Sequence, residues 1–197
     1  MNRYIVLILL ALVLTVSTQA QKRISREYNN VSLSEALNGL AEQQTDYAIM
    51  FLYNELEDFR ITTTVNRKSL PDAIQQMIGF YPIRMIVDES NPKEKKIFVE
   101  CTHKTDRHLT GTIIDEQGQP VAYANVAILN PVDSALLGGG VSNESGYFVV
   151  PTEAHRVIVK CSFVGYRTYY RSCEVGNIGT IQMKPAEYTI NGQLRKY

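Results

Sequence analysis

Residues 61–87 read ITTTVNRKSLPDAIQQMIGFYPIRMIV, and this stretch decides the fold. β-branched residues come first, and Ser69 follows with an acidic residue three positions later, which is a helix-capping pattern. Apolar residues then recur on one helical face, at Leu70, Ala73, Ile74 and Met77. Gly79 is a suitable helix end before the next strand-like run, residues 83–87. The stretch therefore predicts a strand, a helix and a second strand.

An earlier stretch nearly repeats the helix start, since residues 32–37 (SLSEAL) resemble residues 69–74 (SLPDAI). Strand-like runs follow from residue 47 and from residue 60, and residues 83–87 and 96–100 are typical of a closing hairpin. We therefore expect the order β-α-β-β-α-β-β over residues 21–104, with the helices packed on one face of a sheet.

From about residue 109 the chain reads as strands and turns only. About seven short runs are punctuated by turn residues, and residues 138–150 are typical of a hairpin around the turn 143–146. We expect an all-β seven-stranded sandwich over residues 105–186 and a short tail over residues 187–197. The predicted fold class is α+β, with a small mixed domain followed by this sandwich.

The first twenty residues have the pattern of a secretory signal peptide. Arg3 precedes an apolar run of thirteen residues, Tyr4 to Val16, and Thr18 and Ala20 stand at the spacing that a signal peptidase reads. The alternative is an uncleaved anchor, but a spanning helix needs about 20 apolar residues. We expect cleavage after Ala20, export to the periplasm or to the periplasmic face of the outer membrane, and no membrane span in the mature chain.

Charge and cysteine content exclude several classes of protein. The formal net charge is zero and no basic stripe is present, so we expect no nucleic-acid partner. Cys101, Cys161 and Cys173 are too few for a disulfide scaffold. Cys161 and Cys173 fall in neighbouring predicted strands and could form one disulfide, or all three could be buried as small apolar residues.

No motif with catalytic spacing occurs. None of the three histidines opens a His-x-x-Glu zinc pattern, no Gly-x-Ser-x-Gly elbow is present, and the glycines at 138–140 lack the lysine of a phosphate loop. We therefore expect no enzyme, no cofactor and no metal site. Tyr166, Tyr169 and Tyr170 could contact a glycan or a protein partner, or could pack in the core.

Two resemblances add to this interpretation. Residues 31–51 (VSLSEALNGLAEQQTDYAIMF) and 61–89 resemble the short secretin and TonB amino-terminal domain, over about residues 24–101. This resemblance implies a periplasmic domain that binds protein partners, such as an anti-sigma regulator or a TonB-type coupling protein, and does no chemistry.

The second half resembles the carboxypeptidase regulatory-like domain, a transthyretin-like sandwich, over about residues 109–184. The matching positions are Gly111, Gly118, Pro120, Ala124, Val126, Gly146, Phe148, Gly165 and Tyr166. Asn143 replaces the usual aspartate of the Asp-x-x-Gly-x-Phe turn, which keeps the turn chemistry.

A signal peptide and these two domains, in this order, resemble the front end of a TonB-dependent outer-membrane receptor. No plug or barrel sequence is among the 197 residues, so we expect a receptor fragment or a stand-alone relative. The expected function is a non-enzymatic protein-interaction module of the periplasm. The alternatives are a carbohydrate- or surface-binding module, from the tyrosines, and an accessory subunit of a peptidase, from the family name of the sandwich.

Overall fold

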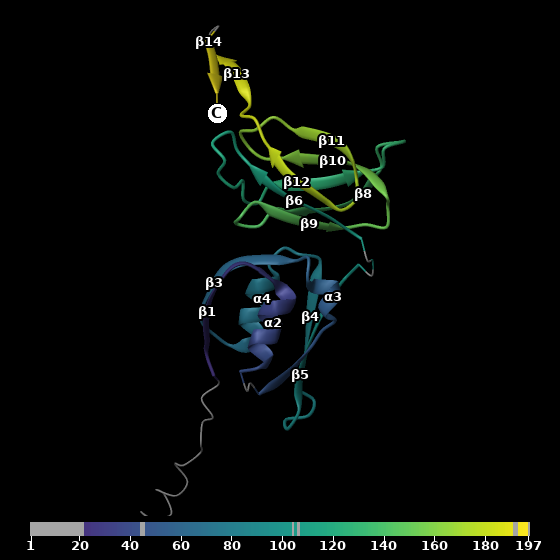
Figure 1. Ribbon diagram of the computed structural model, residues 1–197. Coiled ribbons are helices and arrows are strands. Elements are labelled where there is room, and N and C mark those ends of the chain that lie inside the picture. The colour runs from purple at the N-terminus through teal and green to yellow at the C-terminus, as the bar shows by residue number, and fades with distance from the viewer. Residues whose placement is uncertain (1–21, 44–45, 104, 106, 191–192, 197) are drawn as a thin grey trace, which may run out of the picture.

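The computed structural model describes residues 22–43, 46–103, 105, 107–190 and 193–196. Figure 1 shows two halves packed end to end, one of mixed helices and strands and one in which every described element is a strand. The predicted α+β class is therefore confirmed. The expected signal peptide, residues 1–20, lies outside the described residues. Within the described ranges no helix is long and apolar enough to cross a bilayer.

The amino-terminal half follows the predicted order with one short helix added. Its elements are β1 (Ile24–Ser32), α2 (Leu33–Ala41), β2 (Tyr47–Met50), α3 (Tyr53–Leu56), β3 (Arg60–Lys68), α4 (Leu70–Ile78), β4 (Ile83–Asp88) and β5 (Lys95–Cys101). The hairpin of β4 and β5 is antiparallel, as the sequence predicts.

Both longer helices begin at the predicted caps. Ser32 Oγ accepts a hydrogen bond from the Glu35 amide at 3.1 Å, and Ser69 Oγ accepts one from the Asp72 amide at 3.3 Å. Each bond satisfies an amide that the first helical turn leaves without a partner. Helix α4 ends at Gly79, whose φ of 49° favours glycine.

The expectation of one sheet covered by helices is wrong. Strands β1 and β3 pair with each other as a separate antiparallel sheet, and β5 lies between β2 and β4 in a second sheet. Figure 1 shows α2 and α4 between these two sheets. The reason is the width of the buried face of α2, which includes Leu33, Ser34, Ala36, Leu37 and Leu40. A face this wide is covered by strands on more than one side of the helix.

The added helix α3 is explained by that buried serine. Ser34 Oγ donates a hydrogen bond to the Tyr53 carbonyl at 2.6 Å, which satisfies a hydroxyl that has no access to water. Leu56 and Phe59 follow in the chain and are fully buried in the same core. This segment therefore packs onto α2 before β3 begins.

The carboxy-terminal half contains the predicted seven-stranded sandwich. Its strands are β6 (His108–Ile114), β7 (Asn125–Leu129), β8 (Leu136–Val141), β9 (Tyr147–Pro151), β10 (Arg156–Ser162), β11 (Tyr169–Glu174) and β12 (Asn177–Gln182). One sheet has the order β11-β10-β7-β8 and the other has the order β12-β6-β9. Apolar residues of both sheets form its core, with Leu109, Ile128, Phe148 and Val159 fully buried.

The expected hairpin of residues 138–150 does not form, because β8 and β9 belong to different sheets. The turn between them crosses from one sheet to the other. Gly146 makes this crossing with φ of 75°, and a Cβ atom there would lie 2.3 Å from the Ile113 carbonyl oxygen. The glycine is required both by its backbone angle and by this close approach.

The segment expected as a tail forms a further hairpin of β13 (Glu187–Ile190) and β14 (Gln193–Lys196). It is joined to the sandwich by a salt bridge from Arg167 Nη2 to Glu187 Oε2, at 2.6 Å. Figure 1 shows this hairpin at the end of the molecule far from the amino-terminal half.

Candidate functional site at the junction of the two halves

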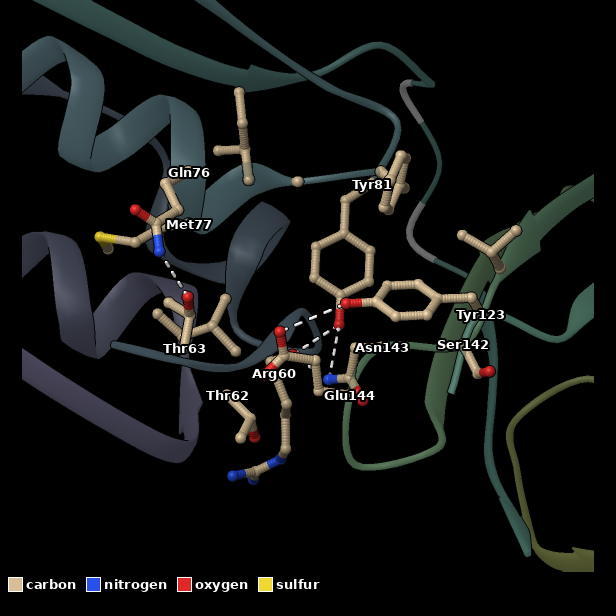
Figure 2. A pocket seen from close by; sticks show the side chains of 15 residues that line it. Arg60, Thr62, Thr63, Gln76, Met77, Tyr81, Tyr123, Ser142, Asn143 and Glu144 are labelled. Carbon is tan, nitrogen blue, oxygen red and sulfur yellow. Dashed lines mark hydrogen bonds between the residues drawn. The ribbon is translucent and has the colours of Figure 1, made fainter. Parts of the chain in front are cut away.

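The junction between the halves is held by a hydrogen-bonded cluster of Arg60, Tyr81 and Asn143. The Arg60 carbonyl, at the start of β3, accepts from the Tyr81 hydroxyl at 2.5 Å and from Asn143 Nδ2 at 2.8 Å. Asn143 Nδ2 also lies 3.2 Å from the Tyr81 hydroxyl, which closes the triangle (Figure 2). A turn of the sandwich thus bonds directly to the backbone of the amino-terminal half.

Asn143 performs two tasks with its two amide atoms. Its Oδ1 accepts from the amides of Ser145 and Tyr147, both at 3.0 Å, and so builds the turn. Its Nδ2 is the donor that reaches Arg60 across the junction. An aspartate could build the same turn, but its ionised carboxylate accepts hydrogen bonds only and has no proton to donate. The departure from the aspartate pattern therefore has a physical reason at this junction.

Burial keeps the Tyr81 hydroxyl neutral, because desolvation raises the pKa of its phenol well above the ordinary value. The ring also packs edge-on against Phe59, with centroids 5.2 Å apart. A neutral, fixed hydroxyl is able to donate to the Arg60 carbonyl throughout the physiological range.

A second set of contacts lies beside the first and includes a charge. His108 Nδ1 lies 2.7 Å from Asp58 Oδ2, and the His108 side chain is almost fully buried. The hydrogen bond from His108 lowers the pKa of Asp58 below its ordinary value. The Tyr147 hydroxyl donates to the Asp58 carbonyl at 2.9 Å. His108 and Tyr147 belong to the sandwich and Asp58 to the other half, so these contacts also join the two.

An open cleft of about 250 Å³ lies against the neutral cluster. One wall comes from β3 and the end of α4, and the other comes from residues 141–144 and Tyr123 of the sandwich (Figure 2). Phe80 and Tyr123 face each other at its mouth, with centroids 5.9 Å apart and planes at 84°. Both rings are exposed, at 75% for Phe80 and 47% for Tyr123.

Tyr123 is held in an unusual backbone conformation, with φ of 60°. Such a left-handed angle is costly for a large side chain and needs support from its surroundings. The buried Ser142 gives that support: its Oγ donates to the Val121 carbonyl at 2.7 Å and accepts from the Ala124 amide at 2.9 Å. The Ser142 carbonyl accepts from the Tyr123 amide itself.

The disulfide of Cys161 and Cys173, one of the two arrangements that the sequence allows, is not formed. Both thiols are free, and the register of β10 and β11 places Cys161 opposite Tyr169 but Cys173 opposite Val157. The two cysteines are thus offset by four residues, roughly 13 Å along the strands, whereas bridged Cα atoms lie within about 7 Å. Burial raises the pKa of the Cys161 thiol to about 12.

Tyr166, Tyr169 and Tyr170, for which both surface contact and core packing were open, do not share one face. Tyr166 and Tyr169 are half-buried and pack against the sandwich core. Tyr170 points outward, is 57% exposed, and has the Lys160 ammonium 5.8 Å from its ring centroid. The structure therefore brings together Phe80, Tyr81, Tyr123, Asn143 and Glu144, and not the tyrosines that the sequence singled out.

No cluster of three metal-binding side chains occurs among the described residues. Two features of the sequence point to the junction. One was the asparagine at the position of an aspartate, and the other was Phe80 directly after a helix-ending glycine. The partners of both residues are far away in the chain, so their meeting could not be inferred from spacing.

Residues 108–185 match the carboxypeptidase regulatory-like domain family. No curated protein is significantly similar to the chain. Among solved structures, two interface mutants of a type II cohesin–X-dockerin complex from Acetivibrio cellulolyticus are similar in part. They have TM-scores of 0.35 and 0.31 and identities of 20% and 18%, over 44% and 45% of this chain and 62% and 64% of theirs.

A 9R-lipoxygenase from Cyanothece PCC8801 is similar with a TM-score of 0.29 and 14% identity, over 39% of this chain and 16% of that one. Each match thus spans less than two thirds of the solved chain. The family match coincides with the seven-stranded sandwich and the turn that follows it. The carboxy-terminal half of the chain is therefore similar to the carboxypeptidase regulatory-like domain.

Proposed function

We propose that the chain is a non-enzymatic protein-interaction module whose binding surface is the cleft between its two halves. The observation that carries this proposal is the mouth of the cleft, where Phe80 and Tyr123 come from different halves and are both exposed. Aromatic side chains that are rigidly held and open to solvent are typical anchors of protein interfaces. The bonded junction below them fixes their relative position.

We further propose that the module works in the periplasm of a bacterial envelope, after removal of residues 1–20. Its order of a mixed domain and then a sandwich is that of the front end of TonB-dependent outer-membrane receptors. The amino-terminal half would dock an anti-sigma regulator or a TonB-type coupling protein, and the sandwich would supply the second wall of the site. The match of residues 108–185 supports the sandwich part of this proposal.

The carbohydrate-binding alternative loses its original reason, since Tyr169 packs on the core while Tyr170 points outward.

Site-specific photo-crosslinking in cells tests the proposal. A benzoylphenylalanine at Phe80 should give a discrete adduct with one envelope protein. The same group at Val132, which is 91% exposed on the loop between β7 and β8, should not give it. Equal adducts from both positions, or none from Phe80, would contradict the proposal.

A further inference from the structure

The mouth of the cleft carries a negative charge next to two exposed rings. Glu144 Oε1 accepts a hydrogen bond from the Tyr123 hydroxyl at 3.2 Å, and burial together with the Glu144 charge raises the pKa of Tyr123. In the part of the chain that the structure describes, no salt bridge to Glu144 is formed. The carboxylate is therefore available to a cation from outside.

Two further features add to this negative potential. Helix α4 ends at the cleft and has no basic residue in its last turn, so no cationic side chain of that turn offsets the negative end of its dipole. The one cationic side chain of the lining, Arg60, donates its Nη1 to the Asn30 carbonyl at 3.0 Å. Figure 2 shows its guanidinium pointing away from Tyr81 and Tyr123.

The rings themselves are arranged to receive a flat group. Phe80 and Tyr123 stand at 84° to each other, so a planar group can lie on the face of one ring while it meets the edge of the other. The left-handed Tyr123 backbone and the Ser142 bonds hold this arrangement before any ligand arrives. Strain of this kind is kept where surrounding structure enforces it, and it is frequent at binding sites.

We propose that this mouth binds the side chain of an arginine in a protein partner. The inference rests on the proposed function above and specifies the chemistry of the partner. A guanidinium stacks on an aromatic face and donates two parallel hydrogen bonds to a carboxylate, which a lysine ammonium does not do. The cleft holds about 250 Å³. That is below the roughly 300–1,000 Å³ of sites that enclose a small molecule, and it suits one side chain.

The test uses a peptide probe and the intact chain. Amide signals of 15N-labelled protein are followed by NMR during titration with acetyl-Gly-Ser-Arg-Ser-Gly-amide, and with matched peptides that carry lysine or glutamine instead. The arginine peptide should shift the amides of Gly79, Phe80 and Ser145 and saturate at about millimolar concentration. The lysine peptide should bind several-fold more weakly, and the glutamine peptide should cause no saturating shift.

Two exposed substitutions give the decisive comparison. Glu144→Gln and Phe80→Ala should each weaken arginine-peptide binding about fivefold, because the first removes the carboxylate and the second removes one of the two rings that contact the guanidinium. Tyr170→Ala changes an exposed tyrosine of β11; it is the matched control and should leave binding unchanged. Equal shifts from the glutamine peptide, or unchanged affinity in Glu144→Gln, would overturn the proposal.

The same variant separates this inference from the proposed function. If the crosslink from position 80 forms equally well in Glu144→Gln and is not reduced by excess arginine peptide, the partner does not use an arginine here. The interaction module would then stand and the arginine site would fall. If position 80 gives no adduct while the arginine peptide binds as described, the arginine site would stand without the proposed partner.

Discussion

The junction of the two halves differs from the strand pair β10 and β11 of the sandwich in the range of its side-chain contacts. At the junction, Asn143 bonds to a residue 83 positions earlier and His108 to a residue 50 positions earlier. On the strand pair, Arg171 reaches only Ile178, and Tyr170 has Lys160 near its ring. A change at the junction should therefore affect both halves, whereas a change on the strand pair should stay local.

The largest expected effect comes from Asn143→Asp. The carboxylate keeps the turn but places an acceptor against the Arg60 carbonyl, where Nδ2 donates at 2.8 Å. Replacing that donor with a carboxylate oxygen sets two acceptors against each other, which should lower the free energy of unfolding by about 1–3 kcal/mol. Urea denaturation measures it, and the Asx turn of Asn130, whose Oδ1 accepts from the Val132 amide, offers the control Asn130→Asp. Equal losses in both variants would show that the bond across the junction contributes nothing of its own.

Two exposed tyrosines should respond differently to replacement by glycine. Tyr123 is 47% exposed with φ of 60°, so relief of the left-handed backbone should offset the lost ring contacts. The net change in unfolding free energy should stay below about 0.5 kcal/mol. Tyr170 lies within β11, where glycine costs about 0.5–1 kcal/mol.

Thermal and urea unfolding of Tyr123→Gly and Tyr170→Gly measure this difference. The two variants carry the same substitution and differ only in the position at which it is made. Arginine-peptide binding should be lost in Tyr123→Gly alone. If Tyr123→Gly destabilises the chain more than Tyr170→Gly, the left-handed backbone of Tyr123 stores no strain that glycine relieves.

Features that depend on interactions between residues close in the sequence were predicted correctly, and features that depend on distant residues were not. The caps at Ser32 and Ser69 are local, and both helices begin where predicted. The seven strands of the sandwich were likewise predicted from local alternation and turns. The partner of each strand is not local, however, so the single sheet expected in the first half and the hairpin of residues 138–150 were both wrong.

The candidate site could not be predicted from the sequence for the same reason. Cys161 and Cys173 are close in the sequence, but the strand register offsets them. The three tyrosines are also close in the sequence, but Tyr166 and Tyr169 pack against the core while Tyr170 is exposed. From the sequence alone, Asn143 is only a mild departure from the usual aspartate of its turn. Its partner Arg60 is fixed by the packing of two halves, which a single sequence does not display.

A pH titration should separate the charged contact from the neutral one. The hydrogen bond from His108 lowers the folded-state pKa of Asp58 below its ordinary 3.8. The pair therefore stabilises the fold above that pH, and this stabilisation is lost as pH falls through the folded-state pKa. Because the carboxylate is half-exposed, its share should stay below about 1 kcal/mol.

Asp58→Asn should therefore flatten the pH dependence of stability below about pH 4, while the Tyr81–Asn143 cluster should show no acid transition of its own. Urea midpoints from pH 3 to pH 7 for both proteins measure this. An unchanged acid slope in Asp58→Asn would place the acid sensitivity outside the junction.

The smallest expected effect is that of a reductant on the strand pair. Cys161 is fully buried with a pKa raised to about 12, and Cys173 is half-buried with its pKa also raised by burial, so both should stay as unreactive thiols. The urea midpoint should be the same with and without dithiothreitol, and iodoacetamide should label Cys161 only after denaturation. Cys173→Ser should lower the free energy of unfolding less than Asn143→Asp does, since it breaks no bond between distant parts of the chain.

A native mass two daltons lower, with a urea midpoint that falls on reduction, would instead show that β10 and β11 are cross-linked. The strand pair would then have to shift its register to bring Cys161 opposite Cys173. The effect of a change in one strand would then no longer stay local.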